Sequence, residues 1–312
     1  MMKCPNINCN ADNPQDAKFC CQCGIKLSVG KKCPFPDCGK NNLPDMAKFC
    51  PDCGRPLGNV SLSEELVISV KSKVQNNIPS DMILVEGGIF MMGSDTGDSD
   101  EKPIHFVTLS DFCIGIYPVT QELWRQVMDR NPSYFKGDKL PVENVSWFDC
   151  VSFCNTLNRR EGFDQFYLIN GESVKLLSGK HGYRLPTEAE WEFAARGGNK
   201  SKGFYYAGGN INDVAWYGSN AVKQTHVVGM KNPNELGLYD MSGNVREWCW
   251  DWANTYPSTS QTNPLGPACG VRRVSRGGSF YFIDNTCRVS SRITYKPSDR
   301  SYDLGFRLVF LP

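Results

Sequence analysis

Apolar residues recur at helical spacings of three and four in three stretches of the chain, and each stretch follows a serine or threonine. Such a side chain can cap a helix by accepting a hydrogen bond from a free backbone N–H. The pattern predicts helices that begin after Thr120, Ser146 and Thr187, the last with a capping box. Glycines predict where the second and third helices end, at Gly162 and Gly197.

Strand signals are shorter and sparser. The clearest candidates are residues 82–92 and 306–310, and the segments between the helices are rich in Gly, Asn, Asp and Pro. Irregular backbone of this kind must obtain hydrogen bonds from side chains, water or metal. We expect one mixed α+β domain over residues 82–312, with much irregular structure.

Three tryptophans alternate near the end of this domain, at Trp248, Trp250 and Trp252. On a strand they would share one face of a sheet. We expect them to pack in the core rather than to form a platform for sugars.

A repeat of about 30 residues occupies the start of the chain, where nine of the fifteen cysteines lie within the first 53 residues. Each copy holds one C-x4-C pair and one C-x2-C pair, ten residues apart in the first copy and eleven in the second. Two such pairs supply the four thiolates of a closed structural zinc site. We assign one zinc to each copy, with the ligands Cys4, Cys9, Cys20 and Cys23, and Cys33, Cys38, Cys50 and Cys53. Cys21 is left over and could compete with Cys20 or Cys23.

Charge narrows the class of partner. The chain has 34 Lys and Arg and 33 Asp and Glu, which leaves no global field for nucleic acid or an anionic membrane. Residues 1–60 carry eight basic and five acidic side chains, and two four-thiolate zinc sites bring this module to about −1. We therefore interpret residues 1–57 as a double zinc ribbon that binds protein, and the charge argues against nucleic acid.

The rest of the organisation follows from polarity. Residues 58–81 form a polar linker, in which the apolar patch 66–74 is equally compatible with a helix or a strand. No apolar run is long enough to span a membrane, and the N-terminus lacks a secretory pattern. Cysteines at dense, regular spacing without an export signal favour metal over disulfides. We expect a cytoplasmic protein that does not contact a membrane.

Eight motifs, read in order, resemble the formylglycine-generating enzyme, or sulfatase-modifying factor, superfamily. They cover about 230 residues: LVEGGIFMMGSD (84–95), PVTQELW (118–124), PVENVSWFDCVSFCN (141–155), YRLPTEAEWEFAARGG (183–198), NELGLYDMSGNVREW (234–248), RVSRGGSF (273–280), CRVSSR (287–292) and GFRLV (305–309). The resemblance implies a variant of the C-type lectin fold. It does not by itself imply an activity.

The oxidase members of the family bind copper through two cysteines placed after the GGS motif. Here Phe282 stands about where the first of these cysteines would fall. Cys287 corresponds instead to the framework position before Arg288. The iron-dependent relatives use histidines of an additional domain that is missing, and His105, His181 and His226 lack the spacing of such a site. We interpret the protein as a non-catalytic, ligand-binding one. The alternative is a formylglycine-generating or non-haem iron oxidoreductase whose site differs from its relatives.

The resemblance also implies one structural calcium ion in the segment GLYDMSGNVREW. The carbonyls of Ser242, Gly243 and Val245 with the side chain of Glu247 would hold it, and Asn244 could assist. The alternative is a turn held by Asn and Glu hydrogen bonds alone.

Residues 280–303 have the composition of a binding surface, with a mixture of Tyr, Phe, Ser, Asp, Asn, Thr and Ile. They resemble the segments of this fold that retroelements diversify by randomising adenines, which cannot yield Met, Trp, Gln, Glu or Lys. Only Lys296 represents those five types here. We expect a protein ligand and at least one exposed side chain among residues 281–283. The candidate ligand-binding residues are Phe280, Tyr281, Phe282, Ile283, Asp284, Asn285, Thr286, Ile293, Thr294, Tyr295, Ser298, Asp299, Ser301, Tyr302 and Asp303.

Overall fold

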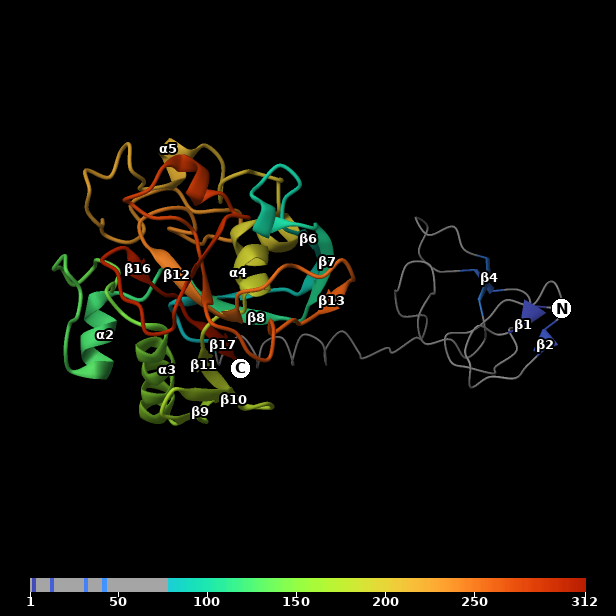
Figure 1. Cartoon of the computed structure of the whole chain (residues 1–312), viewed down its shortest axis with the longest axis horizontal. Coiled ribbons are helices and arrows are strands. Elements are labelled where there is room, and N and C mark those ends of the chain that lie inside the picture. The colour runs from blue at the N-terminus through green and yellow to red at the C-terminus, as the bar shows by residue number, and fades with distance from the viewer. Residues whose placement is uncertain (1, 4–11, 14–30, 33–40, 44–77) are drawn as a thin grey trace. The chain divides into compact units, whose positions relative to one another are not determined.

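The computed structural model describes residues 78–312 and four short strands nearer the N-terminus (Figure 1). The chain divides into two compact units, Met1–Ser72 and Lys73–Pro312. Among the described residues no helix is long and apolar enough to cross a membrane.

The four short strands form two antiparallel pairs. Strand β1 (Met2–Lys3) pairs with β2 (Asp12–Asn13), and β3 (Lys31–Lys32) pairs with β4 (Asn41–Leu43). Each pair brackets one C-x4-C motif of the repeat, so the pairing recurs with the sequence. The eight predicted zinc ligands, Cys21 and residues 58–77 of the predicted linker lie outside the described residues.

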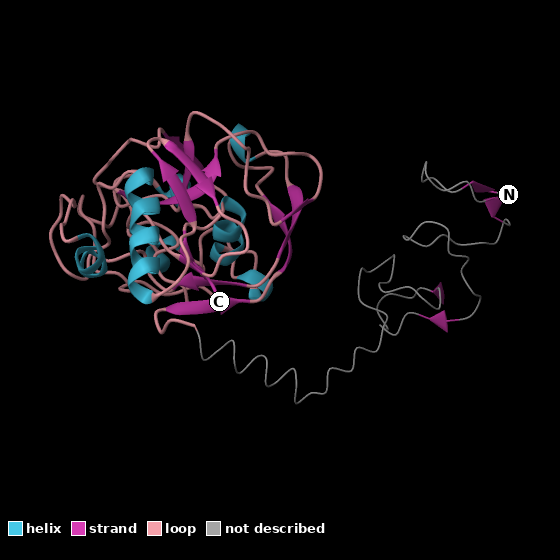
Figure 2. Cartoon of the chain, turned by 90° about the horizontal axis from the view of Figure 1, so that it is seen from below, coloured by secondary structure: helices cyan, strands magenta, loops and turns pink. Residues whose placement is uncertain are grey.

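The three predicted helices are confirmed, and each begins at its predicted cap. They are α2 (Gln121–Met128), α3 (Trp147–Glu161) and α4 (Glu188–Ala195), capped by the side chains of Thr120, Ser146 and Thr187. Gly162 ends α3 in the left-handed conformation, as predicted, whereas Arg196 caps α4 one residue before Gly197. Helices α2 and α3 pack together, and α4 lies apart from them against β6 and β7 (Figures 1 and 2). The remaining short helical turns are η1 (Ser99–Glu101), η2 (Gly198–Lys200), α5 (Ile211–Val214) and η3 (Asp284–Cys287).

A four-stranded antiparallel sheet joins the two ends of the domain, in the order β11 (Gly182–Arg184), β17 (Val309–Leu311), β8 (Phe112–Gly115) and β5 (Met82–Val85). The expectation of one strand over residues 82–92 is wrong, because β5 ends at Val85 and the next strand begins at Gly88 in another sheet. Between them, a Cβ at Gly87 would lie 2.3 Å from the Leu109 carbonyl oxygen.

Beyond Gly87, β6 (Gly88–Met92) joins a second sheet with β7 (His105–Leu109) and β13 (Gln261–Thr262). A third sheet has the order β15 (Arg292–Tyr295), β14 (Arg273–Arg276), β12 (Arg246–Trp252) and β16 (Leu304–Gly305). The hairpin β9 (Tyr167–Asn170) and β10 (Ser173–Leu176) stands alone. The α+β class with much irregular backbone is confirmed.

Two large apolar clusters and a smaller one, around Val214, Ala215, Tyr217 and Cys287, make up the core of the domain. Trp248 belongs to the cluster around α3, and its neighbour Cys249 belongs to the cluster around α4. Trp250 stacks on Tyr167 at 5.3 Å, so the first two tryptophans of β12 pack in the core as expected. A break in register between Trp248 and Trp252 shows an irregularity in this strand.

Buried arginine–carboxylate pairs connect segments that are far apart in the sequence. Arg276 bonds Glu192 of α4 and lies 3.3 Å from Glu188, while Arg292 bonds both oxygens of Glu188. All four side chains are buried. The pairs therefore fasten strands β14 and β15 to helix α4.

Replacing Arg276 by Met should lower the free energy of unfolding by about 3–5 kcal/mol, because two buried carboxylates lose a cation. Urea denaturation measures this change. The control is Arg125→Met, since Arg125 pairs with Asp138 at the surface with side chains 45% and 63% exposed. That variant should lose about 0–1 kcal/mol. Equal losses in the two variants would contradict a stabilising role of the buried network.

Candidate ligand-binding site

Three exposed tyrosines from three loops form one patch, which we call the aromatic surface. Tyr134 is 72% exposed, Tyr281 53% and Tyr302 39%, and Ile283, two residues beyond Tyr281 in the chain, is 67% exposed. The rings of Tyr281 and Tyr302 lie 5.7 Å apart, and those of Tyr134 and Tyr302 lie 6.2 Å apart. The expected exposure within residues 281–283 is therefore observed.

Phe280 lies beneath this surface and is fully buried. Its ring is 5.4 Å from Phe135, 5.9 Å from Tyr302 and 6.4 Å from Tyr281. Its placement among the ligand-contacting residues is thus wrong, because the ring supports the tyrosines from below.

Asp303 is also buried and does not face a ligand. It accepts hydrogen bonds from Arg246 at 2.5 Å, from the Ser279 hydroxyl at 2.8 Å and from the Ser301 hydroxyl. The Arg246 guanidinium stacks between the rings of Phe282 at 4.5 Å and Tyr295 at 4.8 Å. The ion pair therefore fixes the half-buried Phe282 and Tyr295 rather than offering a charge to solvent.

The other predicted ligand residues lie either in strand β15 or in loops and turns. Ile293 and Thr294 are half-buried in β15, where they pair with β14. Those in loops and turns are exposed or half-buried: Asp284, Asn285, Thr286, Ser298, Asp299 and Ser301.

Sequence reasoning missed Tyr134, Phe135 and Arg246. The motif NPSYFKG carries two adjacent aromatics between turn residues, but its distance of about 150 residues from Tyr281 gives no local signal. Glu143 holds this loop by accepting a 2.9 Å bond from the Phe135 N–H. Burial raises the pKa of Glu143 to about 7. The carboxyl group that accepts the hydrogen bond from this loop is therefore partly protonated at neutral pH.

The Glu247 carboxylate, which the sequence assigns to calcium, is taken by protein donors. Arg307 donates to both of its oxygens, at 2.9 and 2.8 Å, and Trp191 donates at 2.7 Å. The Asn244 amide pairs with the backbone of His226, at 3.0 Å in both directions. This arrangement gives the calcium prediction no support and matches the alternative of a hydrogen-bonded turn.

The turn is also bonded to two neighbouring loops. The Gly243 N–H donates to the Gly277 carbonyl at 2.7 Å, and the Ser242 hydroxyl donates to the Cys287 carbonyl at 2.8 Å. Val245 is fully buried. The turn therefore fixes β12 to the loop that carries the aromatic surface.

Two comparisons with protein families agree with the fold. A double zinc ribbon matches residues 4–54, and a sulfatase-modifying factor enzyme 1-like domain matches residues 68–311. The chain belongs to the sulfatase-modifying factor family. Its recognition from the eight sequence motifs is confirmed.

Three relatives show how far the likeness extends. Chaperone protein LppX of Paenibacillus barcinonensis is 40% identical over 74% of this chain and 90% of its own length. The formylglycine-generating enzyme of Streptomyces coelicolor is 41% identical over 54% of this chain and 51% of its own. The solved structure of Treponema denticola variable protein 1 superposes with a TM-score of 0.69 at 38% identity, covering 74% of this chain and 95% of its own.

Within this sulfatase-modifying factor domain, Cys287 lies in the interior and the three histidines contact backbone carbonyls. Burial raises the pKa of the fully buried Cys287 thiol to about 12. Each histidine has a ring nitrogen within hydrogen-bond distance of a backbone carbonyl, of Pro103 for His105, Pro312 for His181 and Ala221 for His226. Among the described residues, no group of three or more His, Cys, Asp and Glu side chains is arranged to hold a metal.

Glu247→Ala should lower the melting temperature by a similar amount with calcium and with chelator, because the loss is that of a buried ion pair with Arg307. A loss of about 3–5 kcal/mol is expected for such a pair. Differential scanning calorimetry in both buffers measures it. A decrease in melting temperature that occurs only in the calcium buffer would instead support a bound calcium ion.

Proposed function

We propose that the protein is a non-catalytic recognition protein whose aromatic surface binds a protein ligand. The observation that supports this most directly is the set of exposed tyrosine rings on a buried aromatic floor. Tyrosine is favoured at protein interfaces because it offers a large amphipathic contact area with only two side-chain torsions. Rings already held by Phe280 and Phe135 lose little further freedom when a ligand binds.

We further propose that residues 280–303 are diversified, as in the variable proteins that the sequence resembles. The likeness to Treponema denticola variable protein 1 and the depletion of five residue types support this. The variable positions would be the exposed ones, with Phe280 and Asp303 kept constant in the interior. Flanking DNA with a near-copy of these codons beside a reverse transcriptase gene would support the proposal, and its absence would count against it.

For residues 4–54 we propose two structural zinc ions, one in each copy of the repeat. The donor set of four thiolates per copy fits tetrahedral zinc, and paired strands bracket the first two ligands of each site. A reducing cytoplasm would keep these thiolates free to bind metal. The ribbons would then act as a folded adaptor for a second protein.

A folding-helper role is the second candidate, favoured by the 40% identity to a protein named as a chaperone. The aromatic surface would then hold an incompletely folded chain. Binding of a urea-unfolded ligand in preference to its native form would distinguish this role from recognition of a folded partner.

Peptides selected by phage display on the wild-type protein should lose at least about tenfold in affinity for a Tyr281→Ala/Tyr302→Ala variant, as expected when interface anchors are truncated. Surface plasmon resonance measures the affinities. The control is Phe106→Ala, which removes an exposed ring from β7, outside the aromatic surface. Selected peptides that bind both variants as well as the wild type would contradict the proposed surface.

Metal analysis of the purified chain should give about two zinc ions and no stoichiometric copper or iron. A cysteine-containing peptide incubated with the protein and added copper should yield no more formylglycine than a protein-free control, because Cys287 is a buried thiol. Stoichiometric redox metal, or formylglycine formed only in the presence of the protein, would instead favour the alternative oxidoreductase.

A further inference from the structure

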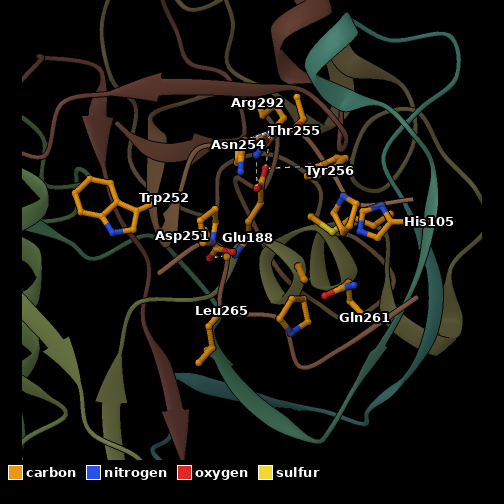
Figure 3. A pocket seen from close by; sticks show the side chains of 16 residues that line it. His105, Glu188, Asp251, Trp252, Asn254, Thr255, Tyr256, Gln261, Leu265 and Arg292 are labelled. Atoms are coloured by element: carbon orange, nitrogen blue, oxygen red, sulfur yellow. Dashed lines mark hydrogen bonds and ion pairs between the residues drawn. The ribbon is translucent and has the colours of Figure 1, made fainter. Parts of the chain in front are cut away.

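A cavity of about 420 Å³ lies at the start of helix α4, on other residues than the aromatic surface. We call it the α4 cavity. Its walls come from β6 and β7, from the first turn of α4, from the end of β12 and from the loop over residues 254–267 (Figure 3). It is therefore a pocket assembled from segments distant in sequence, and nothing in the proposed function uses it.

Asp251 is the one acid lining this cavity without a cationic partner among the described residues. Its Oδ2 accepts a 2.8 Å bond from the Glu188 N–H, and its Oδ1 accepts none. The side chain is only 5% exposed. A Cβ at Gly266 would lie 3.0 Å from Oδ1, so this oxygen faces the loop that closes the cavity.

The neighbouring carboxylates are already paired. Glu188 receives both an Nε–H and an Nη2–H of Arg292, at 2.8 and 2.7 Å, and the Tyr256 hydroxyl at 3.0 Å (Figure 3). Glu190 is paired in the same way with Arg184. The Nη1 of Arg292 donates to the carbonyls of Asp100 and Asn254, so both N–H groups of this nitrogen are used. Burying a carboxylate without a cation has a high free-energy cost. A cationic ligand beside Asp251 would reduce this cost.

Electrostatics around Asp251 agree with this assignment. Burial, together with the charges of Glu188 and Glu190 on α4, raises the pKa of Asp251 to about 7. Arg292 on β15 lowers it, and Arg273 on β14 and Arg184 on β11 also interact with its charge. An ammonium group beside Oδ1 would stabilise the ionised form.

Two further side chains that line the cavity, His105 and Gln261, each have an acceptor atom without a hydrogen-bond partner among the described residues. His105 Nδ1 lies 3.2 Å from the Pro103 carbonyl, which can only accept, so in the neutral ring Nε2 keeps its lone pair. Gln261 donates through Nε2 to Thr259 and Ser260, which leaves its amide oxygen free. Apolar walls of Met92, Leu265, Pro257 and Pro264 complete the lining.

We propose that the α4 cavity binds a primary alkylammonium group, with Asp251 as its counter-ion and the apolar walls around its alkyl stem. An ammonium has three donors and no acceptor, which complements a lining that offers a carboxylate, an imidazole nitrogen and an amide oxygen. The same chemistry is presented by a free amine and by the side chain of a lysine in a partner protein.

The test uses the full chain and two probes, n-butylammonium and Nα-acetyl-lysine N-methylamide, with 1-butanol as the uncharged analogue. Isothermal titration and ligand-observed NMR at pH 8 measure binding. Butanol should not bind. Binding of both ammonium probes would show that the cavity accepts the side chain of a lysine. Binding of n-butylammonium alone would assign the cavity to free amines. Binding of butanol equal to that of the amine, or no binding of either ammonium probe, would overturn the proposal.

Asp251→Asn should reduce n-butylammonium affinity by at least about tenfold while keeping an acceptor for the Glu188 N–H. Asp138→Asn is the matched control, since it neutralises an exposed carboxylate on another part of the domain. If Asp251→Asn fails to fold, Leu265→Trp keeps the carboxylate and should block binding by filling the cavity from its half-exposed loop. Unchanged affinity in a folded Asp251 or Leu265 variant would contradict the site.

The pH profile gives an independent readout. With a pKa of about 7, Asp251 is mostly ionised at pH 8 and mostly neutral at pH 6, so the affinity should fall by about tenfold between them. An affinity that does not change with pH would exclude Asp251 as the counter-ion. The Tyr281→Ala/Tyr302→Ala variant should bind the probes as the wild type does, which separates this site from the proposed function.

Discussion

Buried arginines are the constraint on which this domain depends. Much of its backbone lies outside helices and sheets, so many carbonyl groups need donors from side chains. Arg307 alone donates to the carbonyls of Gly115, Ile116 and Tyr239 while pairing with Glu247. A guanidinium offers five N–H groups in a fixed plane, so one side chain can hold several strands and loops at once. The carboxylates supply the compensating charge that lets these arginines remain buried.

Both sites described above lie against this network. The aromatic surface rests on the Arg246–Asp303 pair, which positions Phe282 and the loop around Ser301. The α4 cavity lies against the Arg292–Glu188 pair, which consumes one carboxylate and leaves Asp251 beside it without a cation. The buried ion pairs thus fix the segments that carry the exposed rings and those that line the cavity.

The sequence was sufficient where the physics is local. Caps at Thr120, Ser146 and Thr187 set the helix starts, since a capping bond spans only three residues. It failed where the outcome depends on distant partners. Nothing near Phe280 shows that Phe135 covers it, and nothing near Glu247 shows that Arg307, 60 residues away, would compete with a cation for its oxygens. Likewise the interruption between β5 and β6 lies where Gly87 closely approaches the Leu109 carbonyl, a contact that a strand pattern over residues 82–92 does not contain.

Burial within residues 279–303 explains how one segment can serve both framework and ligand. Cys287, Arg288 and Arg292 are buried, and the two arginines hold Glu101 and Glu188, so substitutions there would leave carboxylates unpaired. Tyr281 and Ile283 are exposed, and substitutions at exposed positions away from such pairs usually change stability by less than about 0.5 kcal/mol. The same segment therefore separates positions that fix the fold from positions free to change. The proposed diversification would require such a separation, because changes at the exposed positions would leave the buried ion pairs intact.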